Sequence, residues 1–273
     1  MGAYLFDNNE VDEGRAFVYQ GSSSGLSTAA DWTGESNQLD SHFAYSVSTA
    51  GDVNGDGYAD IMAGAKSYEN GETQEGRAFV YHGSSSGLSS MANWTAESNQ
   101  TNAEFGCALS TAGDVNGDGY SDIVIGAPKY SNGHAEEGGI FVYHGSSTGL
   151  QSSVDWTAES GQPGAFFGYS VSTAGDINGD GYSDVIAGAS CYDHGQIDEG
   201  RAFVYYGNSE AGRGLSLRPQ VRRGDDSAPV QAHGIAEENV RITALGRTPY
   251  GRSKVKLECE VKPPRTAFNG TGT

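Results

Sequence analysis

Residues 176–184 read Asp-Ile-Asn-Gly-Asp-Gly-Tyr-Ser-Asp, and nearly the same nine residues stand at 52–60 and 114–122. Each copy begins 62 residues after the one before it. Side-chain oxygens recur at positions 1, 3, 5 and 9, and glycines at positions 4 and 6 allow the positive φ angles that curl a short loop round one centre. Oxygen atoms gathered in this way suit a hard cation, and Ca²⁺ takes about six to eight of them.

Each copy therefore predicts a calcium-binding loop in which position 7 contributes its backbone carbonyl oxygen. The motif is not an EF-hand, because position 12 lacks the bidentate Glu and an apolar, β-rich run follows in place of a helix. The alternative is a polar hairpin turn that binds no metal. Three copies that keep every oxygen favour Ca²⁺ at three sites. The expected ligands are Asp52, Asn54, Asp56, Tyr58 and Asp60 in the first loop, Asp114, Asn116, Asp118, Tyr120 and Asp122 in the second, and Asp176, Asn178, Asp180, Tyr182 and Asp184 in the third.

The period of 62 residues extends beyond these loops. An apolar segment precedes each loop and another follows it, and after them come Glu-Gly-Arg-Ala-Phe-Val-Tyr or a close variant and then a segment that contains Trp. One repeat thus has four short strands, which we call its first to fourth strands. Four antiparallel strands per repeat, with no helical pattern, describe a blade of a β-propeller. The predicted fold class is therefore all-β.

The repeats resemble a known family. Phe105-Gly106, followed by Gly126-Ala127-Pro128, is similar to the FG-GAP repeat, and the blades resemble the N-terminal β-propeller of integrin α chains and its bacterial relatives. The resemblance covers residues 1–206. It departs locally where Ala44 replaces the Gly of Phe-Gly and where Lys66 and Ser190 replace Pro. It implies a ring-shaped propeller with calcium in several blades.

Strand counting along this pattern gives about three and a half blades. We expect a partial first blade at residues 1–38 and repeats at 39–100, 101–162 and 163–206. We therefore expect the chain to be a fragment of a longer secreted protein, with its signal peptide lost by truncation. The alternative is a complete small ring in which strands of the tail fill the incomplete blade.

The tail, residues 207–273, breaks the period and reads as a basic linker followed by a β-rich segment. Residues 218–234 are predicted to be loop-like. Residues 239–245 and 253–261 alternate apolar and polar side chains, which predicts two strands with one buried face. The tail resembles the start of the β-sandwich that follows the propeller in integrin-like chains.

The formal net charge of −19 is unevenly spread. Residues 1–206 hold 28 Asp and Glu against 5 Lys and Arg, whereas residues 207–273 hold 7 against 11. The acidic part argues against nucleic acid as a partner, because phosphate binding needs a basic face. No apolar stretch approaches the roughly 18 residues of a membrane span, so we expect no membrane insertion. The three cysteines do not follow the repeat, so a disulfide framework is not predicted.

Other recurring residues are predicted to be structural. Trp32, Trp94 and Trp156 occupy one blade position, which favours packing between blades over ligand stacking. Arg15, Arg77 and Arg201 are expected to pair with carboxylates at blade junctions. The histidines lack a zinc spacing and no Gly-x-Ser-x-Gly elbow is present, so we predict no enzymatic activity.

Two classes of function remain. The first is a non-catalytic, calcium-binding module of a secreted or cell-surface protein that mediates adhesion by binding a protein or carbohydrate ligand. The second is the accessory propeller of a secreted enzyme such as a polysaccharide lyase or a phospholipase. Calcium sites of low affinity fill only where calcium is abundant, which predicts an extracellular location. Open blade edges predict that the isolated chain self-associates.

Overall fold

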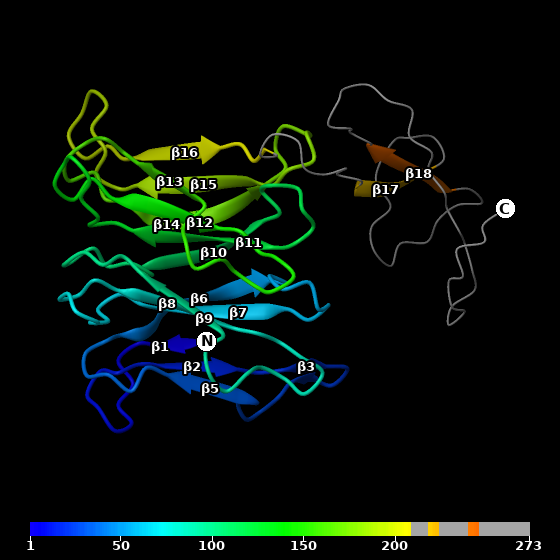
Figure 1. Ribbon diagram of the computed structural model, residues 1–273, viewed down its shortest axis with the longest axis horizontal. Helices are drawn as coiled ribbons and strands as arrows, with labels where there is room; N and C mark the ends of the chain where they lie inside the picture. Colours follow the sequence, from blue (N-terminus) through cyan, green and yellow to red (C-terminus); the bar gives the residue numbers. More distant parts are fainter. Residues whose placement is uncertain (209–217, 224–239, 246–273) are drawn as a thin grey trace. The chain divides into compact units, whose positions relative to one another are not determined.

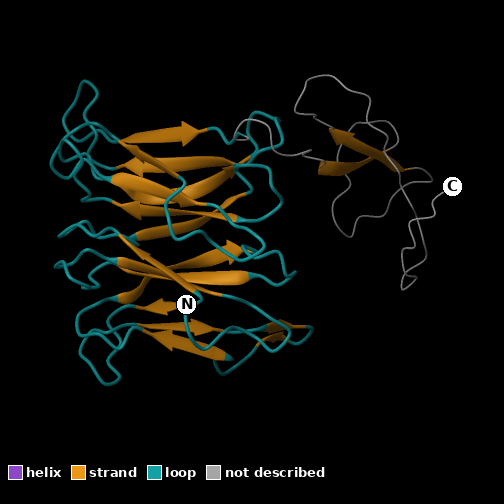
Figure 2. Cartoon of the chain, viewed as in Figure 1, coloured by secondary structure: helices purple, strands orange, loops and turns teal. Residues whose placement is uncertain are grey.

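The computed structural model describes residues 1–208, 218–223 and 240–245. These residues form strands, turns and loops, and no helix occurs among them (Figure 2). The chain divides into two compact units, Met1–Ser209 and Glu210–Thr273. The predicted all-β class is therefore confirmed for the described residues.

The described residues of the first unit form four antiparallel sheets of three or four strands, which we call blades 1 to 4 in chain order (Figure 1). Blades 2 and 3 have four strands each, and their strands pair in the order in which they follow along the chain. Blade 1 lacks a first strand and blade 4 has no fourth strand among the described residues. The strands are β1 (Gly2–Ala3), β2 (Arg15–Val18) and β5 (Trp32–Glu35) in blade 1; β6 (Phe43–Gly51), β7 (Asp60–Ala65), β8 (Arg77–Tyr81) and β9 (Trp94–Glu97) in blade 2; β10 (Ala108–Gly113), β11 (Asp122–Ala127), β12 (Gly139–Tyr143) and β13 (Trp156–Glu159) in blade 3; and β14 (Phe167–Gly175), β15 (Asp184–Ala189) and β16 (Arg201–Tyr205) in blade 4. A short hairpin of β3 (Gly21–Ser22) and β4 (Gly25–Leu26) extends blade 1.

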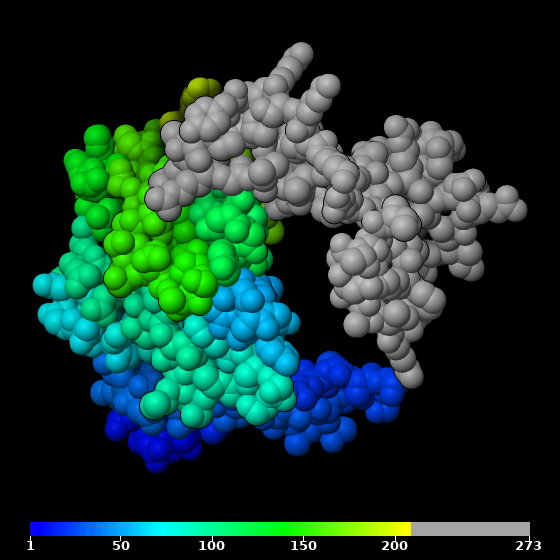
Figure 3. All heavy atoms as spheres, turned by 45° about the vertical axis from the view of Figure 1, so that its right-hand side comes forward, coloured from blue at the N-terminus to red at the C-terminus, as the bar shows by residue number. Residues whose placement is uncertain are grey.

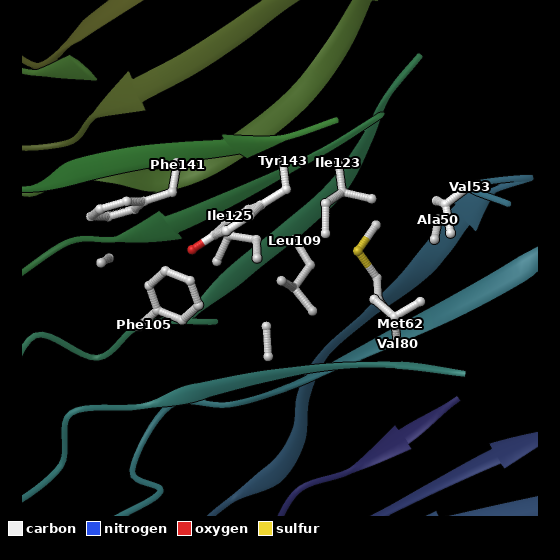
Figure 4. Packing of buried hydrophobic residues seen from close by; sticks show 12 residues of the cluster. Ala50, Val53, Met62, Val80, Phe105, Leu109, Ile123, Ile125, Phe141 and Tyr143 are labelled. Carbon is white, nitrogen blue, oxygen red and sulfur yellow. The ribbon is translucent and has the colours of Figure 1, made fainter. Parts of the chain in front are cut away.

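The hydrophobic core lies between neighbouring blades. The residues of blades 1 to 4 follow one another as successive bands along the unit (Figure 3). Between blades 2 and 3, Met62 and Val80 of one sheet face Leu109, Ile123 and Ile125 of the next (Figure 4). Similar clusters join blade 1 to blade 2 and blade 3 to blade 4. Successive side chains of a strand point to opposite faces of its sheet, so Ile123 and Ile125 of β11 pack toward blade 2 while Val124 packs toward blade 4.

Close backbone contacts explain the glycines of the repeat signature. Gly126 of β11 lies against the carbonyl oxygen of Gly168 in the next blade, and a Cβ atom at Gly126 would overlap that oxygen. Gly64 lies against Gly106 in the same way. Gly106 and Gly168 each have a φ of +84°, which glycine adopts at little cost. Ala44 occupies the corresponding place in blade 2 with a φ of +62°, a conformation that strains an L-residue.

The second unit contains one described antiparallel pair, β17 (Arg218–Arg223) with β18 (Val240–Leu245). Strand β18 confirms the strand predicted at 239–245. The prediction of a loop over 218–234 is wrong for β17, because backbone pairing with β18 makes a strand of a segment whose side chains do not alternate apolar with polar. The strand predicted at 253–261 lies outside the described residues.

Candidate calcium loops

Each candidate loop joins the first strand of a blade to the second, between β6 and β7, β10 and β11, and β14 and β15. The carboxylate at position 1 organises the turn. In the first loop, Asp52 Oδ1 accepts hydrogen bonds from the N–H groups of Gly55 at 2.7 Å and Asp56 at 3.1 Å, and Asp52 Oδ2 accepts one from Gly57 at 2.9 Å. The second loop repeats all three bonds and the third repeats two of them. The N–H groups of consecutive positions, 4 to 6 in the first two loops and 5 and 6 in the third, therefore point to one carboxylate.

Positions 3 and 5 also turn their oxygens toward the loop. Asn54 Oδ1 accepts the N–H of Asp56 at 3.0 Å, and Asp56 Oδ1 accepts the N–H of Tyr58 at 2.9 Å. The side-chain amide of Asn54 donates to Asp56 Oδ2 at 3.0 Å. The same three contacts recur in the loops of blades 3 and 4. The repeat thus preserves the geometry of the loop as well as its sequence.

The aspartate at position 9 has a structural role that the sequence does not predict. Asp60 is completely buried, and its two oxygens accept the N–H groups of Val53 at 2.9 Å and Gly83 at 2.8 Å. Asp122 and Asp184 make the corresponding bonds in blades 3 and 4. This carboxylate therefore ties its own loop to the turn that follows the third strand of the same blade.

Electrostatics around the second loop favour a positive charge. The pKa of Asp122 is raised to about 8, chiefly by burial; the backbone N–H groups of Gly145 and Val115 act to lower it, and the carboxylates of Asp118 and Asp114 act to raise it. Burial also raises the pKa of Asp114, with Asp118 adding to the effect. Carboxylates that repel one another in a buried site hold their charge more readily when a cation lies among them.

The tyrosine at position 7 contacts the preceding blade. A Cβ atom at Gly117 of the second loop would overlap the ring of Tyr182, and Gly55 has the same relation to Tyr120. Tyr182 is 5% exposed, whereas Tyr58, which faces blade 1, is 44% exposed. The expected ligand role of these carbonyl oxygens stays a prediction.

Within the described residues, no three His, Cys, Asp or Glu side chains stand together as a ready metal cluster. The loop carboxylates accept backbone N–H groups instead. The structure thus brings together positions 1, 3 and 5 of each loop. The carboxylate at position 9 instead accepts backbone N–H groups that tie the loop to the turn after the third strand. All fifteen predicted ligands therefore remain candidates.

Two recurring contacts outside the loops escape prediction from the sequence. The side-chain amide of Gln100 donates to Ser131 O at 2.9 Å, and its carbonyl oxygen accepts the N–H of Ser131 at 2.7 Å, which clasps blade 2 to blade 3. Gln38 and Gln162 form the same clasp at the other junctions. Glu75 is completely buried, and its Oε1 accepts the N–H of Asn70 at 2.6 Å. In the sequence, these contacts are indicated only by the recurrence of their Gln and Glu residues with the repeat.

The structure places the tryptophans at blade junctions, as predicted. Trp94 packs edge-on against Tyr143 of blade 3, and its indole N–H donates to Gln151 O at 2.8 Å. Arg15 and Arg77 also pair with carboxylates, but within a blade and not at a junction as expected, whereas Arg201 lies over the rings of Tyr192 and Phe203. Arg77 Nε lies 3.6 Å from Glu97 Oε2, because β8 and β9 pair these two residues directly across the sheet.

The sequence matches the FG-GAP repeat family over residues 43–81, 105–143 and 167–205, each running from the first strand of a blade to the end of the third. This chain is an FG-GAP repeat protein. The FG-GAP chain is 32% identical to integrin alpha-5 of Xenopus laevis over 205 residues, which cover 72% of the chain and 18% of that relative. It is 33% identical to integrin alpha-V of Gallus gallus over 187 residues, or 64% of the chain and 17% of the relative.

A third relative, integrin alpha-PS2 of Drosophila melanogaster, is 35% identical over 165 residues, which cover 56% of the FG-GAP chain and 12% of the relative. The FG-GAP chain thus spans less than a fifth of the length of these relatives. The expected resemblance to integrin α chains is confirmed. Among the described residues, the FG-GAP chain has no helix with the length and apolar character needed to cross a bilayer.

Proposed function

We propose that the FG-GAP blades form a non-catalytic, calcium-stabilised binding module of a secreted or cell-surface protein, which mediates adhesion or binds a protein ligand. The observation that carries this proposal is the closely similar curl of three acidic loops, each with carboxylate and amide oxygens turned inward. The similarity to integrin α chains supports a binding role at the cell surface.

The donor set of each loop fits Ca²⁺. In the second loop Asp114, Asn116 and Asp118 would supply side-chain oxygens, Tyr120 its carbonyl oxygen, and Asp122 a further carboxylate. The lone pairs that remain on these oxygens after they accept N–H groups are available to a cation. Bound Ca²⁺ would neutralise carboxylates that otherwise repel one another, and so hold the loop against the neighbouring blade.

Ca²⁺ that binds only the folded state at ten times its dissociation constant adds about 1.4 kcal/mol per site to the free energy of unfolding. Three such sites would add about 4 kcal/mol, a large part of the 5–15 kcal/mol or so that is typical of a domain. For extracellular modules of this kind we expect dissociation constants of about 10⁻⁴–10⁻³ M.

The test is calorimetric titration of Ca²⁺ into EDTA-treated protein, with Mg²⁺ in parallel, and melting in both conditions. Asp118→Asn keeps the acceptor for the N–H of Tyr120 but removes the charge, so it should lower the melting temperature in Ca²⁺ and leave it nearly unchanged in EDTA. Glu136→Gln makes the same charge change at an exposed site outside the loops and is the matched control. Fewer than two sites, or equal preference for Mg²⁺, would contradict the proposal.

No feature of the described residues favours the accessory propeller of a secreted enzyme. Loop tips at the ends of the blades offer the surface on which a ligand would be recognised. The ligand-binding experiment is therefore a pull-down of extracellular proteins with the chain as bait, in Ca²⁺ and in EDTA.

A further inference from the structure

A set of contacts around an arginine recurs where the third strand of a blade begins. In blade 2, Arg77 Nε lies 3.6 Å from Glu97 Oε2, and Arg77 Nη2 donates to Thr95 Oγ1 at 2.9 Å. The guanidinium carbon lies 5.1 Å from the centre of the Tyr68 ring. A carboxylate, a hydroxyl and an aromatic ring therefore hold one planar cation, an arrangement that suits the fixed fork of guanidinium donors.

Two other blades repeat this arrangement. In blade 1, Arg15 Nε lies 3.5 Å from Glu35 Oε2, and Arg15 Nη2 donates to Thr33 Oγ1 at 3.2 Å. In blade 4, the guanidinium carbon of Arg201 lies 5.3 Å from the centre of the Tyr192 ring. The contacts thus belong to the repeat, and strand register produces them because it sets Arg15 directly opposite Glu35.

Blade 3 keeps the partners of this cation but not the arginine. Gly139 stands at the arginine position, and the pairing of β12 with β13 sets Glu159 directly opposite it. Thr157 and Tyr130 stand exactly one repeat, 62 residues, after the threonine and the tyrosine of blade 2. Glu159 Oε1 accepts the side-chain amide of Asn132 at 3.1 Å, as the equivalent carboxylate of blade 2 does at 2.8 Å. The carboxylate of blade 3 is therefore held as it is beside an arginine.

The other basic side chains of this unit have partners elsewhere. Residues 1–206 contain five Lys and Arg, of which three are the arginines already described. Lys129 pairs with Glu104 at 2.7 Å, and Lys66 lies 4.1 Å from the centre of the Tyr45 ring. Within the described part of the chain, the carboxylate opposite Gly139 therefore has no cationic partner.

The surroundings of Gly139 leave these acceptors open to solvent. A Cβ atom at Gly139 would lie 3.2 Å from the Tyr130 ring and 3.3 Å from the Phe141 ring, so the two rings lie where the stem of an arginine would begin. Thr157 is exposed and Glu159 is half-buried. A guanidinium group would therefore reach them from solvent, with its stem pointing outward.

We infer that Glu159, Thr157 and Tyr130 of blade 3 form a binding site for an alkylguanidinium cation. The cation donates to Glu159 Oε2 and Thr157 Oγ1 and lies against the Tyr130 ring. The excess of 28 Asp and Glu over 5 Lys and Arg in residues 1–206 attracts cations to this surface. One partly exposed ion pair and one ring contact suit a dissociation constant of about 1–10 mM.

This site is separate from the candidate calcium loops. Strand β11 begins at Asp122, beside the acidic loop, and ends at Ala127, which pairs with Gly139. The guanidinium site and the acidic loop of blade 3 therefore lie at opposite ends of the sheet and share no residue. We expect cation binding to persist in EDTA, so that failure of the calcium proposal is distinguished from failure of this one.

The probe is n-butylguanidinium, titrated into the full chain in Ca²⁺ and in EDTA while backbone amide shifts are followed by NMR. We expect saturable shifts at Thr157 and Tyr130, and none at Thr95 and Tyr68, whose cation is Arg77. n-Butylammonium has the same charge and stem but lacks the planar fork, and it should bind at least about threefold more weakly. Acetylarginine methylamide, titrated in parallel, distinguishes two sources of the group: its binding assigns the site to guanidinium groups carried by peptides, and its failure beside binding of n-butylguanidinium assigns the site to free small cations.

Three variants and one control test the residues. Gly139→Arg supplies the arginine of the other blades and should abolish binding of the probe. Arg77→Gly should create a second site, with new saturable shifts in blade 2. Glu159→Gln keeps an acceptor for Asn132 but removes the charge, and it should weaken binding by at least about fivefold. Glu136→Gln makes the same charge change at an exposed position and should alter binding by less than about twofold.

Four results would overturn the inference. The first is the absence of saturable shifts at Thr157 with about 50 mM n-butylguanidinium, a concentration that should fill a millimolar site. The second is equally tight binding of n-butylammonium. The third is an equal effect of Glu159→Gln and Glu136→Gln. The fourth is a folded Gly139→Arg chain that binds the probe as the wild type does; if this variant does not fold, the absence of a second site in Arg77→Gly decides against the inference in its place.

Discussion

Substitution of Gly126 by Ala tests whether close blade contacts explain the glycines of the repeat. Gly126 lies in β11 with ordinary strand geometry, so a methyl group would bring no backbone strain of its own. The methyl would instead overlap the carbonyl oxygen of Gly168 in blade 4, which is a backbone atom. Gly188, at the same position in blade 4, offers a matched control because, among the described residues, its Cβ would meet only Ser170, with Oγ at 2.6 Å and the backbone oxygen at 4.0 Å.

The two substitutions should therefore differ widely. In Gly126→Ala, blades 3 and 4 must move apart over a buried cluster, and overpacking of this kind lowers the free energy of unfolding by about 1–3 kcal/mol. In Gly188→Ala, the hydroxyl of Ser170 rotates away, and the loss of glycine freedom in the unfolded chain offsets about 0.4–1 kcal/mol of the remaining cost. We expect Gly188→Ala to lie within about 0.5 kcal/mol of the wild type.

Urea unfolding followed by tryptophan fluorescence measures both changes in the same buffer. The slope of the transition shows whether the surface exposed on unfolding stays constant. Equal destabilisation in the two variants would mean that the strand itself, and not the contact between blades, requires glycine. A neutral Gly126→Ala would refute the proposed contact altogether.

Further predictions address the other recurring features. Ala44→Gly should raise the free energy of unfolding by up to about 1 kcal/mol, because glycine relieves the strain at positive φ. Gly106→Ala should lower it, since its Cβ would lie 2.8 Å from Arg77 O. If urea titrations showed that both substitutions change the free energy of unfolding in the same direction, the strain argument would be contradicted. Gln100→Leu removes both bonds of a blade clasp and should cost about 1–2 kcal/mol, against less than about 0.5 kcal/mol for the exposed control Gln151→Leu, as judged by calorimetric melting. The Cys107 thiol is buried, and burial raises its pKa to about 11. Iodoacetamide at pH 8 should therefore modify Cys107 more slowly than Cys191, as measured by peptide mass spectrometry. A faster reaction at Cys107 would show that the segment around it opens to solvent.

The sequence predicts the repeat, its four strands and the packing of the tryptophans, because these depend on local pattern and on a strict period. It does not predict the clasp by Gln100, since the partner, Ser131, is set by how two blades stack and not by spacing along one strand. The sequence also does not predict the buried hydrogen bonds of Asp60, because the position of its carboxylate in the loop indicates a metal ligand. In the structure, Gly83, far along the chain, makes it a buried acceptor as well.

The pairing of the arginines and the strand at residues 218–223 could not be predicted from the sequence pattern. Arg77 was expected at a blade junction, but the register of β8 with β9 sets Glu97 directly opposite it. Residues 218–223 are basic and contain Pro219, which depresses any strand prediction. The partner strand β18 nevertheless supplies backbone pairing along the whole segment.

Each hydrophobic cluster is built from residues of two neighbouring sheets, so no blade has a hydrophobic core of its own. The unit behaves as a row of neighbours in which an inner sheet is held from both sides and an end sheet from one. The third strand shows the gradient: β12 of blade 3 is buried along its whole length, whereas three of the five residues of β16 in blade 4 are exposed. Because neighbouring sheets cover both of its faces, we expect the backbone amides of β12 to exchange with solvent more slowly than those of β16.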